Sequence, residues 1–77
     1  MYHLQITKSM HNKEISGRKI SVITDKDYEN LEAVDHTLKD QLAKSINDLD
    51  FDNNECLFES REQNVVANYY IRLEEFN

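Results

Sequence analysis

The fold is decided by residues 28–49, which read YENLEAVDHTLKDQLAKSINDL. Their apolar members are separated by steps of 3, 3, 4, 4, 4 and 3 positions, which is the spacing of one stripe along an amphipathic helix. The residues of this stripe are Tyr28, Leu31, Val34, Leu38, Leu42, Ile46 and Leu49. A stripe of this length predicts a helix that covers a hydrophobic surface supplied by the rest of the chain.

The start of the helix is predicted from the polar residues that precede the stripe. Residues 24–27, TDKD, contain N-cap candidates. Asp25, Asp27 and Glu29 also suit the positive end of the helix dipole. We therefore expect the helix to run from roughly Lys26 to Asp48.

Before the helix, polar and apolar residues alternate, which is typical of half-buried strands. The alternation covers residues 2–8 and returns in residues 18–24 through Ile20 and Val22. Residues 9–17 are mainly polar and contain the only glycine, so we expect them to form a turn or loop between two paired strands.

After the helix, residues 55–60 are typical of a short strand, residues 61–64 of a turn, and residues 64–76 of a long strand. The element order ββαββ predicts an α+β fold. In this fold one long helix packs on a four-stranded, mainly antiparallel sheet, whose strand order is left open. In the last strand one face carries Val65, Ala67, Tyr69, Ile71 and Leu73, and the other carries Val66, Asn68, Tyr70, Arg72 and Glu74.

Length and composition suit one small globular domain over residues 1–77, since 39% of the residues are hydrophobic and 31% are charged. No apolar run approaches the ~20 residues that a membrane span needs, and the first residues lack the layout of a signal peptide. The single cysteine, Cys56, has no disulfide partner in the chain and is expected to be a small buried hydrophobic residue. These features predict a cytoplasmic protein.

Charge is distributed unevenly along the chain. Fifteen acidic and nine basic residues give a net charge of −6. Residues 1–24 contain four bases and one acid, a net of +3, whereas residues 25–77 contain five bases and 14 acids, a net of −9. Because the acidic part would repel phosphates, nucleic acid is disfavoured as its direct partner and a basic protein surface is favoured.

The carboxylates expected to bind such a partner follow the exposed side of the predicted helix and continue past its end. Along the helix they lie ~5–12 Å apart, a spacing comparable with that of successive duplex phosphates. The alternative is an ordinary solvated face with the i,i+4 pairs Asp35–Lys39 and Asp40–Lys44. The candidate residues are Asp25, Glu29, Glu32, Asp40, Asp48, Asp50, Asp52, Glu55, Glu59 and Glu62.

The same acidic segment offers an alternative function, a small calcium-binding module. Asp48, Asp50, Asp52 and Glu59 match positions 1, 3, 5 and 12 of an EF-hand loop. Asn53, however, stands where that loop requires glycine, and a strand pattern follows where the second helix should begin. A turn that uses Asp and Asn is therefore favoured over a metal site.

The three histidines show no spacing that is typical of a metal site or an activated nucleophile. Only His36 falls beside carboxylates, those of Glu32 and Asp40, one helical turn away on either side. We assign no catalytic residue, metal ligand or cofactor and expect a protein that is not an enzyme. An activity based on His36 is the remaining alternative.

A very small acidic chain with one cysteine and this α+β pattern resembles the early host-takeover proteins of phages of Gram-positive bacteria, several of which are DNA mimics. It is similar above all to phage inhibitors of the histone-like nucleoid protein HU. The resemblance covers the whole chain in size and charge and rests on the acidic residues named above, without Glu62, and not on a motif. It implies an inhibitor that occupies the DNA-binding surface of a basic host protein. The basic N-terminal hairpin departs from this pattern, so mimicry would be confined to one face.

Two further questions stay open at the level of sequence. Val66, Tyr70 and Phe76 on the outer face of the last strand are either interface residues or ordinary exposed side chains. Association of two copies of the chain is also left open.

Overall fold

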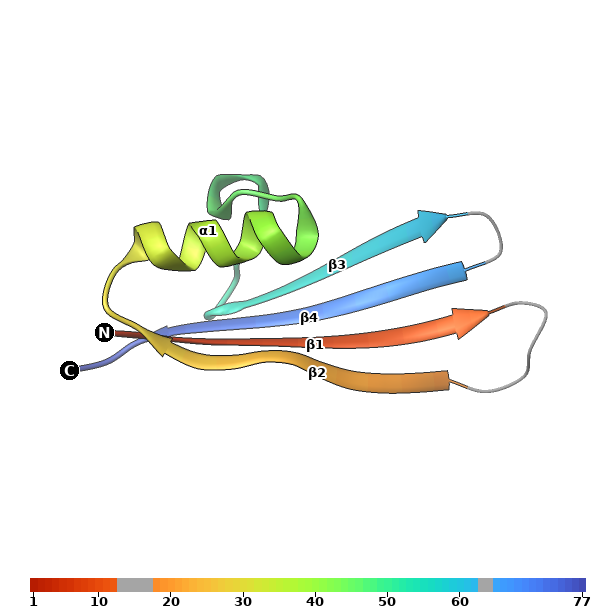
Figure 1. Cartoon of the computed structure of the whole chain (residues 1–77), viewed down its shortest axis with the longest axis horizontal. Helices are drawn as coiled ribbons and strands as arrows, with labels where there is room; N and C mark the ends of the chain where they lie inside the picture. Colours follow the sequence, from red (N-terminus) through yellow and green to blue (C-terminus); the bar gives the residue numbers. More distant parts are fainter. Residues whose placement is uncertain (13–17, 63–64) are drawn as a thin grey trace.

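The chain folds into a long four-stranded sheet with one helix along one side (Figure 1). The computed structural model describes residues 1–12, 18–62 and 65–77. The sheet order is β2-β1-β4-β3, and the three pairings are antiparallel. The predicted α+β class and ββαββ order are confirmed. The strands are β1 Tyr2–Asn12, β2 Arg18–Tyr28, β3 Glu55–Glu62 and β4 Val65–Glu75.

The helix is shorter than the sequence predicts. Helix α1 spans Leu31–Leu42, which is 12 residues. It begins after Asn30, whose side-chain oxygen accepts a hydrogen bond of 2.9 Å from the backbone N–H of Ala33. Asn30 satisfies an N–H group that has no partner inside the helix, so it is the N-cap in place of the predicted TDKD segment.

Strand β2 takes the residues that were expected to begin the helix. It pairs with β1 along its whole length, from Tyr28 opposite Tyr2 to Arg18 opposite His11. The ladder hydrogen bonds to β1 override the local capping signals of residues 24–27. The prediction that the helix begins near Lys26, with Asp25 at its start, is therefore wrong, because both residues lie in β2.

The C-terminal end of α1 is set by Ala43, which adopts the left-handed conformation with φ 55° and donates its N–H to the carbonyl of Lys39 at 3.0 Å. A 3₁₀ helix, η1, follows at Ile46–Asp48. Ile46 and Leu49 nevertheless pack on the core. The apolar stripe therefore continues past the end of α1, although the backbone there is no longer α-helical.

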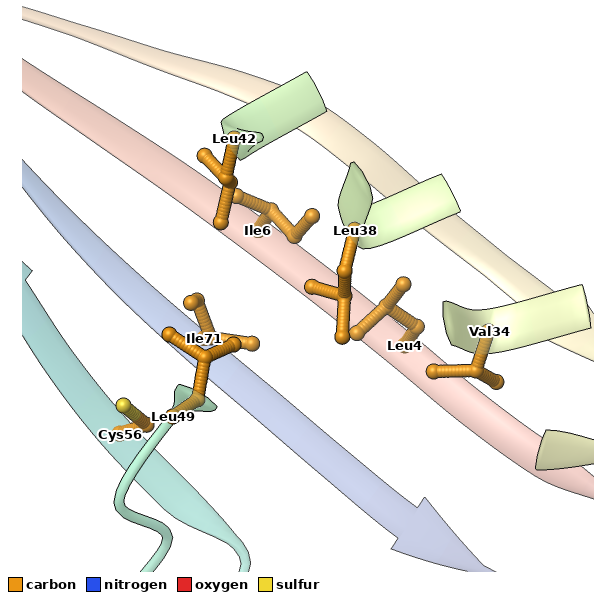
Figure 2. Close-up of a cluster of buried hydrophobic side chains, with 8 residues drawn as sticks. All are labelled: Leu4, Ile6, Val34, Leu38, Leu42, Leu49, Cys56 and Ile71. Carbon is orange, nitrogen blue, oxygen red and sulfur yellow. The ribbon is translucent and has the colours of Figure 1, made fainter. Parts of the chain in front are cut away.

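The core lies between α1 and the half of the sheet nearest the chain termini (Figure 2). Val34, Leu38 and Leu42 project from α1 onto Leu4 and Ile6 of β1. A second group comes from the segment after η1 and from the strands β3 and β4, and its members are Leu49, Cys56 and Ile71. Cys56 is a buried free thiol, which confirms its predicted place in the core.

The strands reach well beyond α1, and the molecule measures 45 × 21 × 19 Å (Figure 1). Residues 9–12 and 61–62 belong to β1 and β3, although they were expected to form turns. The rest of those predicted turns, residues 13–17 and 63–64, lies outside the described residues. In the part of the chain that the structure describes, no helix is long and apolar enough to cross a membrane.

Candidate functional site

Most of the negative charge lies on the helix side of the sheet. We call residues 29–52 the helix layer; it comprises the connection after β2, α1, η1 and the loop that leads to β3. The layer contains seven acidic and two basic residues, a net of −5. The four strands contain seven acidic and six basic residues, a net of −1. The net negative charge of residues 25–77 therefore lies mainly on one contiguous segment, which the fold places on one side of the sheet.

One carboxylate of the helix layer is used to hold the layer together. Oδ1 of Asp35 accepts a hydrogen bond of 2.7 Å from the backbone N–H of Ile46, and its Oδ2 lies 3.0 Å from Nζ of Lys39. The hydrogen bond from Ile46, followed by that from Lys39, lowers the pKa of Asp35 below its usual value. The predicted i,i+4 pair Asp35–Lys39 is thus confirmed, and Asp35 also joins α1 to η1.

A second carboxylate caps η1. The backbone N–H and the hydroxyl of Ser45 both donate to Oδ2 of Asp48 at 3.0 Å. These bonds lower the pKa of Asp48, the backbone bond most. Asp48 is therefore engaged in local structure.

The other predicted i,i+4 pair, Asp40–Lys44, is wrong. Since α1 ends at Leu42, Lys44 is no longer one turn beyond Asp40 on a helix. Its ammonium lies 5.5 Å from the ring centroid of Phe58, where it makes a cation–π contact. Both bases of the helix layer are thus directed to partners other than its remaining carboxylates.

Five carboxylates of the helix layer have no hydrogen bond or ion pair within residues 1–12, 18–62 and 65–77. All five belong to exposed residues. Glu32 and Asp40 are eight residues apart on α1, which corresponds to ~12 Å along the axis at ~1.5 Å per residue. All five were candidates from the sequence, and they are Glu29, Glu32, Asp40, Asp50 and Asp52.

The remaining candidates do not join this group. Successive strand residues point to opposite faces, and the ladder places Asp25, Glu55 and Glu59 on the face turned away from α1, which we call the open face. Glu59 is paired there with Arg61. Glu62 is the last residue of β3, and its side chain lies outside the description. The single continuous anionic surface expected from the sequence is thus divided between two faces.

The acidic residues of the open face are in ion pairs. His3 contacts two carboxylates of β2, with Nδ1 2.6 Å from Asp27 and Nε2 2.7 Å from Asp25. The hydrogen bond to Asp27 is the main cause that raises the pKa of His3 above 6.5. Sequence reasoning missed this cluster because it placed Asp25 and Asp27 at a helix start. Alternation continued through residues 25–28 would have placed Asp25 and Asp27 on one face of a strand, but their position beside His3 follows only from the register of β1 and β2.

A second polar group links β3 and β4 on the same face. Arg72 contacts the carboxylates of Glu74 and Glu55, the latter at 3.1 Å, and the hydroxyl of Tyr70 donates to Glu55 at 2.8 Å. The Glu74 carboxylate, followed by Tyr70, raises the pKa of Arg72 above its usual range. The negative charges on this part of the open face are therefore compensated by cationic side chains of the strands themselves.

The acidic loop has the geometry of a turn. Asn53 and Asn54 have φ values of 52° and 68°. Asp52 and Glu55 exchange two backbone hydrogen bonds of 2.8 and 3.0 Å around them, as in a two-residue type I′ turn. This agrees with the preference for turn chemistry over a calcium loop. No group of three or more His, Cys, Asp or Glu side chains is placed to hold a metal ion among the described residues.

His36 lies in an open depression of about 690 Å³ beside α1, which is also lined by Tyr28 and Lys26 of β2. Within the described chain its imidazole makes no hydrogen bond or ion pair with Glu32 or Asp40. The contacts of an activated acid–base pair are therefore not formed here.

The chain matches no family model, no curated protein and no solved structure.

Proposed function

We propose that this chain is a non-enzymatic protein-binding inhibitor whose helix layer takes the place of DNA on a basic DNA-binding protein. The observation that carries the proposal is the set of five exposed carboxylates that have no partner among the described residues, in a layer of net charge −5. Folded proteins commonly compensate neighbouring acids with nearby bases. Here the two bases of the layer contact Asp35 and the Phe58 ring instead.

The mechanism is competition. Lysine and arginine side chains that contact phosphates would instead contact Glu32 and Asp40 on α1 and the acids of the loop before β3. The partner then releases its DNA because one surface cannot hold both. Since such an interface is largely electrostatic, its affinity falls steeply as salt is raised.

The histone-like nucleoid protein HU is the first partner to test, because the chain resembles phage inhibitors of that protein in size and charge. The site of action is then the cytoplasm of the infected bacterium. Among the described bases of the N-terminal hairpin, Arg18 lies on the open face, whereas Lys8, Lys19 and Lys26 lie on the same side of the sheet as the helix layer. Lys8 and Lys26 make cation–π contacts there with Tyr69 and Tyr28.

The decisive experiment compares two faces that carry the same substitution. The helix-layer variant is Glu32→Lys with Asp40→Lys, and the open-face variant is Asp25→Lys with Glu59→Lys. Both change the net charge equally, so a nonspecific charge effect would weaken both. Binding to purified HU and to basic proteins of a bacterial lysate is measured at low and high salt, in competition with duplex DNA.

The proposal expects the helix-layer variant to lose at least about tenfold in affinity, which is ~1.4 kcal/mol, while the open-face variant remains within about twofold. Circular dichroism confirms that both variants are folded. Equal loss in the two variants, or recovery of no basic nucleic-acid-binding protein by the wild-type chain at low salt, would refute the proposal.

A further inference from the structure

The open face carries exposed apolar side chains. Ile20, Val22 and Leu57 are 66%, 61% and 81% exposed, and the ladder places all three on this face. Thr7 lies opposite both Val22 and Tyr70, and Tyr70 lies opposite Leu57, so one row of side chains crosses the sheet. We call Val22, Thr7, Tyr70 and Leu57 the central row.

The charges on the two sides of the central row are opposite in sign. Toward the chain termini the open face carries the base Arg72 and four acids, a net of −3 that becomes −2 when His3 is protonated. Toward the far ends of the hairpins it carries Arg18, Arg61 and Glu59 among the described residues, a net of +1. The four acids of the first end are Asp25, Asp27, Glu55 and Glu74.

Each end of this face is therefore complementary to the other end of the same face. Such a surface binds a second copy of itself when the strands of the two copies run in opposite directions. A two-fold axis along the central row places Val22 on Val22 and Leu57 on Leu57, while one row away it places Ile20 over Asp25 and Glu59 over Glu55 of the other copy. Arg18 and Asp27 each lie two rows of the open face away from Val22, on opposite sides of it. The axis therefore places Arg18 of one copy over Asp27 of the other.

The area is sufficient for association. Positions 3–11 of β1 span ~30 Å at ~3.4 Å per residue, and four strands at ~4.8 Å spacing span ~19 Å. The face therefore offers about 600 Å² per copy, or about 1,200 Å² for the pair, which lies at the lower limit of specific interfaces. Figure 1 shows α1 and η1 on the other side of the sheet, where they leave this face uncovered.

We propose that two copies of this chain associate through their open faces, antiparallel, with the central rows in contact. Because the interface is small and partly charged, association lies in the micromolar range and weakens as salt rises. The pair carries its two helix layers on its outer sides. The inference does not depend on the helix layer or on any basic partner.

Sedimentation equilibrium of the full chain, from low micromolar to near-millimolar concentration, tests the proposal. Leu57→Lys replaces a side chain that is 81% exposed, so the core is untouched. It is expected to weaken dimerisation by at least about tenfold. Leu31→Lys changes an exposed apolar residue of α1 in the same way and is the matched control, which dimerises as the wild type does.

The antiparallel arrangement is tested by reversal of charge. Arg18→Glu and Asp27→Arg each weaken the dimer, and the two substitutions together restore it. A wild-type chain that is monomeric at every concentration overturns the proposal and leaves the open face to a different protein. A dimer that Leu57→Lys does not affect, or a double reversal weaker than both single ones, overturns it as well.

Discussion

Nδ1 of His3 lies 2.6 Å from Oδ1 of Asp27, and the other ring nitrogen lies 2.7 Å from Oδ1 of Asp25. A neutral imidazole has a single N–H donor, so only the imidazolium donates to both carboxylates. The cluster therefore binds a proton on folding, which agrees with the raised pKa of His3. Glu74, opposite His3 on β4, adds a further negative charge nearby.

This proton makes the free energy of unfolding depend on pH. The folded pKa of His3 lies above 6.5, so its stabilisation is complete below pH ~6.5 and is lost as the pH rises through the folded pKa. We expect the urea concentration at the unfolding midpoint to decrease as the pH is raised from slightly acidic to slightly alkaline values. His3→Gln should make this decrease smaller. His36→Gln, on the exposed side of α1, is the control that retains it. Identical profiles for His3→Gln and the wild type would contradict the assignment.

The contact between Asp35 and Ile46 predicts how α1 and η1 are joined. Asp35→Asn keeps the size of the side chain but removes its negative charge. That charge strengthens the 2.7 Å hydrogen bond from the backbone N–H of Ile46 and attracts the ammonium of Lys39. We expect lower stability at neutral pH and faster amide exchange at Ile46. Because the pKa of Asp35 is lowered, its stabilisation is present above the unfolded pKa and is lost as the pH falls through the folded value.

The control for this change is Asp40→Asn, which removes a carboxylate of α1 that has no partner among the described residues. Its amide exchange at Ile46 should equal that of the wild type. An equal effect from both variants would mean that net charge, not the bond to Ile46, is responsible.

The core predicts the largest single loss of stability. Leu38 is fully buried against Leu4 and the sheet, and Leu38→Ala should cost ~2–5 kcal/mol, a large share of the ~4–12 kcal/mol expected for a domain of this size. Leu57→Ala, at an 81% exposed position, should change the free energy of unfolding of the monomer, measured below the concentration at which two copies associate, by less than ~0.5 kcal/mol. Thermal unfolding of both variants checks the difference.

The left-handed residue at the end of α1 predicts a stabilising substitution. Ala43 has φ 55°, a conformation that costs a residue with a Cβ atom ~1–2 kcal/mol. We expect Ala43→Gly to raise the free energy of unfolding by ~0.5–1 kcal/mol, after the greater freedom of glycine in the unfolded chain is taken into account. Ala33→Gly, inside α1, should instead lower it by ~1 kcal/mol. A loss at both positions would show that Ala43 is not left-handed in solution.

The alternation of β4 shows how far local pattern determines structure. Ala67 and Ile71 were assigned to one face from the sequence alone, and both are buried there. The stripe on residues 28–49 likewise contains the side chains that α1 and the segment after it bury, down to Leu49, but it also contains Leu31, which is 43% exposed. The spacing of apolar residues indicates which side chains can face the core, but the irregularity in the β1–β2 pairing leaves Ile20 and Val22 exposed on the open face.

The ends of the elements did not follow from the sequence. The segment TDKD has good capping residues, yet it forms part of β2. Asp40 and Lys44 have ideal helical spacing, yet the left-handed Ala43 ends the helix between them. Both outcomes depend on long-range pairing and on packing at the sheet, which no local window contains. The candidate site was divided for the same reason, because Asp25, Glu55 and Glu59 lie on strands whose register sends them to the open face.

The sequence by itself determined the class of fold, the set of side chains from which the core is drawn and the excess of acidic charge, since these depend on composition and periodicity. Only the tertiary structure decided where that charge lies. Pairing of β2 with β1 removed Asp25 from the helix side, and the contacts of Lys39 and Lys44 left five carboxylates of the helix layer without a partner among the described residues. The physical reason is that hydrogen bonds between strands and packing on a shared core act between residues far apart in the chain.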